Sequence, residues 1–178
     1  MIYQAQRPQE TLMEQNIIEV GILHQKAFVR VKGRGDFQNS QVLKDFIHNT
    51  LNKGMTDLLI DLKQCKTMDS TFMGVLAGTA LELKNKHQKK LTLFNVEEHN
   101  FKLLTTLGIH IFMNIVPNEH LASPPEEMEQ LQPKTLPKQD MAKEMLNAHS
   151  TLMDISEENR IKFKDVYEYL KEETKKQL

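Results

Sequence analysis

Hydrophobic positions in the first part of the chain follow the pattern of β-strands. Two apolar segments, residues 17–23 and 27–31, flank the polar tripeptide His24-Gln25-Lys26, which predicts a β-hairpin. Valine and basic residues alternate in the second segment, so the valines face one side of a sheet. The polar stretch Gly33-Arg34-Gly35-Asp36 is expected to end this second strand.

Apolar residues at helical spacing follow in three segments. The first predicted helix is capped by Asn39 or Ser40 and ends at Gly54, the second begins at Ser70, and the third covers residues 97–107. Strands are expected between and after these helices, at residues 57–62, 91–96 and 109–116. This order of elements predicts an α/β fold, a mixed β-sheet of about 100 residues with an N-terminal hairpin and crossover helices.

The C-terminal part of the chain differs from this domain. Prolines cluster there in a polar stretch, at positions 117, 124, 125, 133 and 137, which is typical of a linker. Residues 126–130 can form a helical turn within it, and two longer helices are predicted at 139–152 and 156–176. The predicted units are a polar leader (1–15), an α/β domain (16–116), a proline-rich linker (117–138) and a C-terminal helical extension (139–178).

Composition excludes several classes of function. The formal net charge is −1 with both signs mixed, and there is no Trp, which argues against a nucleic-acid-binding surface. Residues 1–15 lack the apolar core of a signal peptide, and no apolar run approaches the roughly 20 residues that span a bilayer. Cys65 is the only cysteine, and the seven histidines have no metal-ligand spacing. We expect a cytoplasmic protein without membrane insertion, metal or cofactor.

The most informative segment joins the strand at 57–62 to the helix that begins at Ser70. There Asp69 and Ser70 stand at the helix start, and the small residues Gly74, Ala77 and Gly78 follow. The simplest reading is a helix cap, which is common and contributes about 1 kcal/mol. A hydroxyl at this place also suits a phosphorylation site, because a helix N-terminus tolerates the added negative charge.

Two short motifs in these positions resemble the STAS family, the domain of bacterial anti-sigma factor antagonists. Gly33-Arg34-Gly35-Asp36 is similar to the Gly-x-x-Asp that follows the second strand of that family. Asp69-Ser70-Thr71-Phe72-Met73-Gly74 resembles its Asp-Ser-(Ser/Thr)-Gly-aliphatic-(Gly/Ala) pattern at the start of the second helix. The resemblance covers residues 17–116.

The resemblance implies partner switching in signal transduction and transcription regulation. Ser70 would be phosphorylated by an anti-sigma factor that is also a serine kinase. The unphosphorylated chain would bind that kinase and free a sigma factor, and a PP2C-type phosphatase would restore it. The implied partner-binding residues are Asp36, Asp69, Thr71, Phe72, Met73 and Gly74, although the simpler interpretation of Asp36 is a turn or cap residue. Phe72 stands where the family often has glycine, so it either enlarges the docking surface or packs inward. A homodimer is left open.

Other functions fit the sequence less well. A scaffold or adaptor role, in a stress-sensing complex or a lipid-transporter assembly, needs no phosphorylation and is kept as the alternative. A response-regulator receiver built on Asp61 lacks the acidic pair after the first strand and the lysine after the last. An enzyme with Ser70 as nucleophile needs a base and an oxyanion hole, and neither a Gly-x-Ser-x-Gly motif nor a P-loop is present. Sequence alone does not place a distant histidine beside Ser70, and we predict no enzymatic activity.

Overall fold

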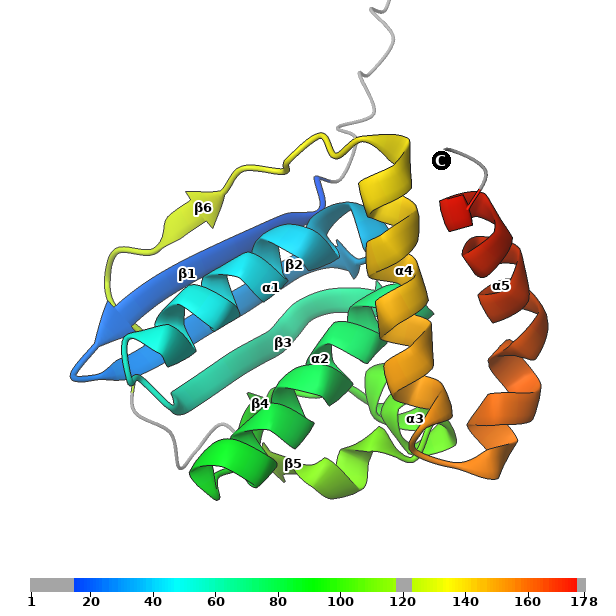
Figure 1. The fold of residues 1–178 in the computed structure, drawn as a ribbon. Helices are drawn as coiled ribbons and strands as arrows, with labels where there is room; N and C mark the ends of the chain where they lie inside the picture. The colour runs from blue at the N-terminus through cyan, green and yellow to red at the C-terminus, as the bar shows by residue number, and fades with distance from the viewer. Residues whose placement is uncertain (1–14, 118–122, 176–178) are drawn as a thin grey trace, which may run out of the picture.

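A six-stranded sheet forms the centre of the molecule, in the order β5-β4-β3-β2-β1-β6 (Figure 1). The computed structural model describes residues 15–117 and 123–175. The strands are β1 (Ile17–Leu23), β2 (Lys26–Gly35), β3 (Asp57–Met68), β4 (Leu91–Phe94), β5 (Met113–Val116) and β6 (Glu129–Leu131). β1 is antiparallel to β2 and β6, whereas β2, β3, β4 and β5 are parallel, so the predicted mixed sheet is confirmed.

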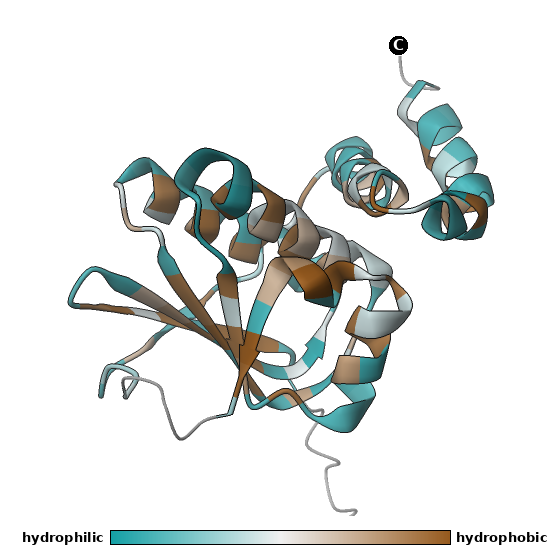
Figure 2. Ribbon diagram, turned by 90° about the horizontal axis from the view of Figure 1, so that it is seen from below, coloured by the Kyte–Doolittle hydropathy of each residue, from teal (hydrophilic) through white to brown (hydrophobic). Residues whose placement is uncertain are grey.

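Five α-helices accompany the sheet in the described residues. They are α1 (Phe37–Asn52), α2 (Ser70–Glu82), α3 (Glu98–Thr106), α4 (Lys138–Met153) and α5 (Glu157–Lys175). Figure 2 shows α1 and α2 as a layer on one face of the sheet, with α4 and α5 as a further pair beyond that layer. A π-helical turn (Leu83–His87) continues α2, and a 3-10 turn (Ile109–Phe112) precedes β5.

The main hydrophobic core lies between the sheet and the layer of α1 and α2. Alternate residues of β2 and β3 point into it, among them Val29, Val31, Leu58, Ile60 and Leu62. A smaller cluster of Phe28, Leu59 and Phe94 covers part of the opposite face. Because β3 has buried apolar residues on both faces, its consecutive apolar pattern at 58–60 is explained.

The predicted hairpin of β1 and β2 is confirmed, and its turn has two residues. Leu23 pairs with Lys26, and the two residues between them have positive φ angles, 48° at His24 and 64° at Gln25. Two-residue turns of this hand match the right-handed twist of the paired strands. The strand β2 ends at Gly35, within the stretch Gly33-Arg34-Gly35-Asp36 that was predicted to end it, after a register shift between Gly33 and Arg34.

Three local predictions, for the cap of α1 and for residues 109–112 and 126–130, are wrong. The cap of α1 is Asp36, and Asn39 instead occupies the third helical position and bonds back to Asp36. Residues 109–112 form a 3-10 turn, not strand, since Gly108 has a left-handed conformation and ends α3 in a tight turn. Residues 129–131 form β6 against β1, because pairing with that edge satisfies backbone groups that a single helical turn would not.

Candidate functional site

The N-termini of α1 and α2 lie side by side. β2 and β3 are adjacent parallel strands, and their last residues, Gly35 and Met68, are paired in the sheet. Parallel strands end at the same edge, so α1 and α2 begin next to each other. The peptide N–H of Asp69 donates to the carbonyl oxygen of Gly35 at 2.9 Å, which fixes the two starts together.

Asp36 holds the start of α1. One carboxylate oxygen accepts from the backbone N–H of Gln38 at 3.0 Å, and the other accepts from the amide of Asn16 at 3.0 Å. The side chain of Asn39 accepts from the backbone N–H of Asp36 at 3.0 Å, which completes a capping box. In this structure Asp36 therefore serves as a cap, and the residue is only 8% exposed.

Asp69 caps α2 and also contacts the start of α1. Its carboxylate accepts from the backbone N–H of Phe72 at 2.8 Å and from that of Phe37 at 2.9 Å. Burial raises the pKa of Asp69, and the nearby charge of Asp36 raises it further, although the two backbone donors oppose this shift. The predicted cap is confirmed, and the two acidic residues of the motifs lie in one cluster.

Ser70 is the first residue of α2, and its hydroxyl reaches a side chain from the C-terminal extension. Ser70 Oγ lies 2.9 Å from Nε2 of His149 in α4. Nδ1 of His149 lies 2.7 Å from the carbonyl oxygen of Met145, which can only accept, so Nδ1 carries the proton of that bond. In the neutral ring Nε2 is then the acceptor, and Ser70 donates its hydroxyl proton to it.

His149 is held from several sides. It is 3% exposed, and its ring makes an edge contact with Phe163 of α5, with 5.2 Å between the centroids. One turn into α2, a Cβ added to Gly74 would lie 2.6 Å from the carbonyl oxygen of Ala148. Gly74 thus permits the close approach of α4 that brings His149 to Ser70.

Four implied partner-binding residues are buried in this conformation. Thr71, Phe72 and Met73 are at most 5% exposed, and Gly74 is covered by α4. Phe72 packs inward: a Cβ on Gly35 would lie 2.7 Å from its ring. Direct contact of these side chains with a partner therefore stays a prediction.

A serine and a histidine at hydrogen-bond distance are also part of many hydrolase sites, so this chemistry has to be considered. Here the hydroxyl and the imidazole lie between α2 and α4, and the backbone N–H of Phe72 is already bonded to Asp69. An acyl substrate would need both room at Ser70 and free donors for its oxyanion. The arrangement favours a covered hydroxyl over a nucleophile.

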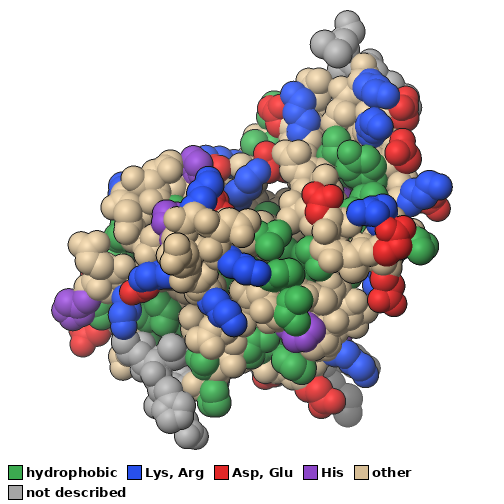
Figure 3. Space-filling model, turned by 60° about the horizontal axis from the view of Figure 1, so that its bottom comes forward, with side chains coloured by type: hydrophobic (Ala, Val, Ile, Leu, Met, Phe, Trp, Pro, Cys, Tyr) green, Lys and Arg blue, Asp and Glu red, His purple; other side chains and the backbone are tan. Residues whose placement is uncertain are grey.

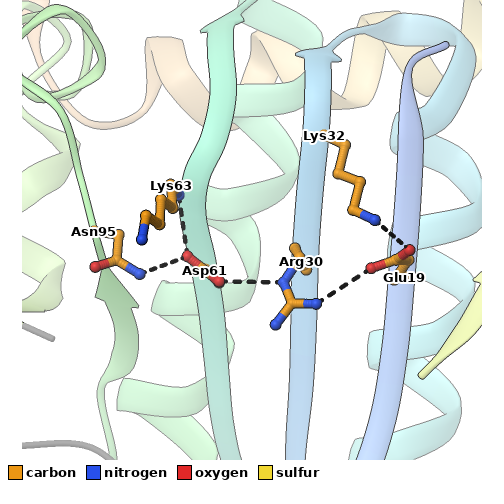
Figure 4. Close-up of polar contacts among 6 residues, drawn as sticks. All are labelled: Glu19, Arg30, Lys32, Asp61, Lys63 and Asn95. Atoms are coloured by element: carbon orange, nitrogen blue, oxygen red, sulfur yellow. Dashed lines mark hydrogen bonds and ion pairs between the residues drawn. The ribbon is translucent and has the colours of Figure 1, made fainter. Parts of the chain in front are cut away.

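Asp61, the residue considered for a receiver, is part of a row of charges across the open sheet face (Figure 4). It accepts from Arg30 Nε at 3.3 Å and from the Asn95 amide at 2.8 Å, and Arg30 continues the row to Glu19. Its carboxylate is thus paired with the guanidinium of Arg30 on β2.

Burial raises the pKa of the Cys65 thiol to about 11, so at neutral pH this cysteine stays protonated and unreactive.

The described residues carry neither a metal-binding cluster nor a membrane-spanning helix. Within residues 15–117 and 123–175, no cluster of three or more His, Cys, Asp or Glu side chains could bind a metal ion. None of the helices in the described part of the chain is both long and apolar enough to traverse a bilayer. The face in Figure 3 carries acidic and basic side chains intermixed, including on the lobe formed by α4 and α5.

Comparisons with solved structures agree with this fold. TM1081 of Thermotoga maritima is 15% identical, with 58% of this chain and 87% of that chain covered and a TM-score of 0.52. An anti-sigma factor antagonist from Mycobacterium paratuberculosis is 18% identical, with coverages of 57% and 86% and a TM-score of 0.50. The phosphorylated form of the Bacillus cell fate determinant SpoIIAA is 18% identical, with coverages of 57% and 93% and a TM-score of 0.48. No curated protein matches the chain in sequence.

The family model described as the STAS domain matches residues 18–122, which is more than half of the chain. The match contains both helix starts and the Asp69-Ser70 pair, and ends before α4 and α5. The chain therefore belongs to the STAS domain family.

Proposed function

We propose that this protein is a non-catalytic, cytoplasmic anti-sigma factor antagonist whose binding to an anti-sigma factor with serine kinase activity is controlled by phosphorylation of Ser70. The observation that carries the proposal is the position of the Ser70 hydroxyl, at the first residue of α2 beside the capping Asp69, in a STAS domain. The anti-sigma factor antagonist from Mycobacterium paratuberculosis, which shares the fold, makes this role the first to test.

The switch would act on binding rather than on folding. The kinase would transfer the γ-phosphoryl group of a nucleoside triphosphate to Ser70 Oγ, with release of the hydroxyl proton and the nucleoside diphosphate. A PP2C-type phosphatase would hydrolyse the ester again. The phosphate adds about −1.5 to −2 charges, which the N-terminus of α2 tolerates in water. A protein partner packed on Ser70 would have to desolvate this charge next to Asp69, so it would dissociate.

A scaffold or adaptor role is the second candidate, because one observation favours it. In this structure α4 lies against Ser70, which is half-buried, and the hydroxyl is bonded to His149. A STAS domain that only assembles a complex would have no need for an accessible hydroxyl. The two roles differ in whether Ser70 is phosphorylated in the cell: the switch requires it and the scaffold does not.

Substitutions at Ser70 test the proposed switch. Ser70→Asp is expected to fold normally and to bind the anti-sigma kinase of the same organism at least tenfold more weakly than Ser70→Asn. Ser70→Asn is the matched control, since it has the size of aspartate without its charge. Ser70→Ala should bind and remain bound when ATP is added. Calorimetric titration measures the affinities, and equal affinities for Ser70→Asp and Ser70→Asn would refute the charge mechanism.

A further inference from the structure

The helical hairpin, defined as α4 with α5, lies on the outer side of α2 and covers its first two turns (Figure 1). Ala148 is seated on Gly74, and the next residue, His149, bonds to Ser70. Leu152 and Phe163 join the main core cluster, so the hairpin is packed rather than loosely attached. The family match ends at residue 122, and the cover is therefore an addition to the STAS domain.

Polar contacts as well as apolar ones join the hairpin to the α/β domain. Asn159, at the start of α5, donates to the carbonyl oxygens of Leu107 and Leu152, each at 2.9 Å. Lys44 of α1 and Glu144 of α4 form an ion pair at 2.5 Å, with the lysine side chain 43% exposed. Between these helices a groove remains, lined by Gly78, Thr79 and Asn147 among others. An attachment of this kind can open without unfolding the sheet.

A phosphate on Ser70 does not fit the closed arrangement. The Ser70 hydroxyl is 2.9 Å from His149 Nε2, so a phosphate on Oγ that pointed along this hydrogen bond would overlap the ring. In any other orientation the phosphate ester has no hydroxyl proton left to donate to Nε2. Retreat of the imidazole would break its contact with Phe163 and the hydrogen bond of its other nitrogen to Met145. The carboxylate of Asp69 lies at the same helix start, which adds like charge.

From these contacts we propose that the hairpin is a built-in cover of the Ser70 surface, and that hairpin docking and phosphorylation of Ser70 exclude each other. The inference rests on the proposed function, and it names the hairpin as an intramolecular competitor of the partner. The kinase must displace α4 before it reaches Ser70, and the phosphate then prevents α4 from returning. By linkage, phosphorylation lowers the equilibrium constant for docking of the hairpin by a certain factor. Docking lowers the equilibrium constant for phosphorylation by the same factor.

Hydrogen exchange on the full chain tests this proposal without any partner. Phosphoserine is incorporated at position 70 during translation, and amide exchange of α4 is compared with that of the serine form by mass spectrometry. We expect exchange in α4 to accelerate by about 5- to 150-fold, the range of typical coupling energies, since a released helix of this length is only marginally stable. Amides of β3 should exchange at the same rate in both forms.

Two glycines of α2 supply the matched controls. Gly74→Ala should open the hairpin without phosphate, because its Cβ would meet the Ala148 carbonyl at 2.6 Å, although alanine strengthens the helix itself. Gly78→Ala makes the same change one turn later, where the nearest atom, of Thr151, is 3.9 Å away. The first variant should exchange in α4 like the phosphorylated chain, and the second like the wild type.

Unchanged or slower exchange of α4 in the phosphoserine protein, with Gly74→Ala accelerated, would overturn the proposal. Slower exchange would mean that His149 clamps the phosphate instead of excluding it. The proposed function has a separate test, in which equal partner affinities of Ser70→Asp and Ser70→Asn would refute it. The exchange experiment contains no partner, so its outcome does not depend on that test.

Discussion

Phe72→Ala is expected to lower the free energy of unfolding by about 3–5 kcal/mol, the usual cost of removing a fully buried phenylalanine. Phe72 is 0% exposed and belongs to the main core cluster, and its ring fills the space directly above Gly35. The substitution leaves a cavity that rigid β2 and β3 cannot close. Urea denaturation followed by far-UV circular dichroism measures the change, because the chain has no Trp for fluorescence.

Phe101→Ala is the matched control for this measurement. Phe101 lies on α3 and is 43% exposed, so its truncation should cost less than about 1 kcal/mol. If Phe72→Ala were no more destabilising than Phe101→Ala, Phe72 would not be a core residue. The alternative, that Phe72 enlarges a docking surface, would then be favoured.

Asn159→Ala is expected to cost about 1–3 kcal/mol, with the loss concentrated in the hairpin. Asn159 is 1% exposed and its amide is the donor to two carbonyl oxygens, those of Leu107 and Leu152. Without it the carbonyl oxygen of Leu107 loses this donor, whereas that of Leu152 still accepts from the backbone N–H of Ile155 at 3.3 Å. One unsatisfied buried group costs about 1–3 kcal/mol. Limited proteolysis should cut near residues 154–156 faster in this variant than in the wild type.

Asn147→Ala controls for a change of asparagine in the same hairpin. Asn147 is exposed on α4, and alanine is the better helix former there, so stability should stay within about 0.5 kcal/mol. Equal protease resistance of all three proteins would show that Asn159 does not anchor the hairpin.

Most of the α/β fold follows from the sequence because its signals are local. The turn at His24 and Gln25, the apolar strand at 58–60 and the stop at Gly108 each reflect the residues at that position. Asp69 was predictable as a cap for the same reason. Ser156 likewise accepts from the backbone N–H of Asn159 at 3.1 Å at the start of α5, as a serine before acidic residues predicts.

Features that depend on distant contacts were not predictable in the same way. β6 lies in a polar, proline-rich segment, and only the free edge of β1 makes it a strand. Asn39 and Ser40 are cap candidates by residue type, but the extension of β2 to Gly35 places Asp36 at the cap position of α1. The predicted leader, residues 1–15, lies almost entirely outside the described residues, and so does part of the predicted linker.

His149 was the functional residue that sequence reasoning missed. It lies 79 positions from Ser70, and no motif links the two. One signal was available: His149 follows Met145 and precedes Leu152 on the buried side of α4, so a histidine there needs a polar partner. The identity of that partner depends on how α4 crosses α2, which the small side chains at Gly74 and Ala148 decide.

The measurement that tests the central claim most directly is the phosphate occupancy of Ser70 in the native cells. Phosphopeptide mass spectrometry of the isolated protein, with and without stress, determines it. The proposed switch predicts phosphate on Ser70 with an occupancy that changes between the two conditions. A Ser70 that is unmodified in every condition would contradict the switch and favour the scaffold role, with the hairpin as a permanent cover.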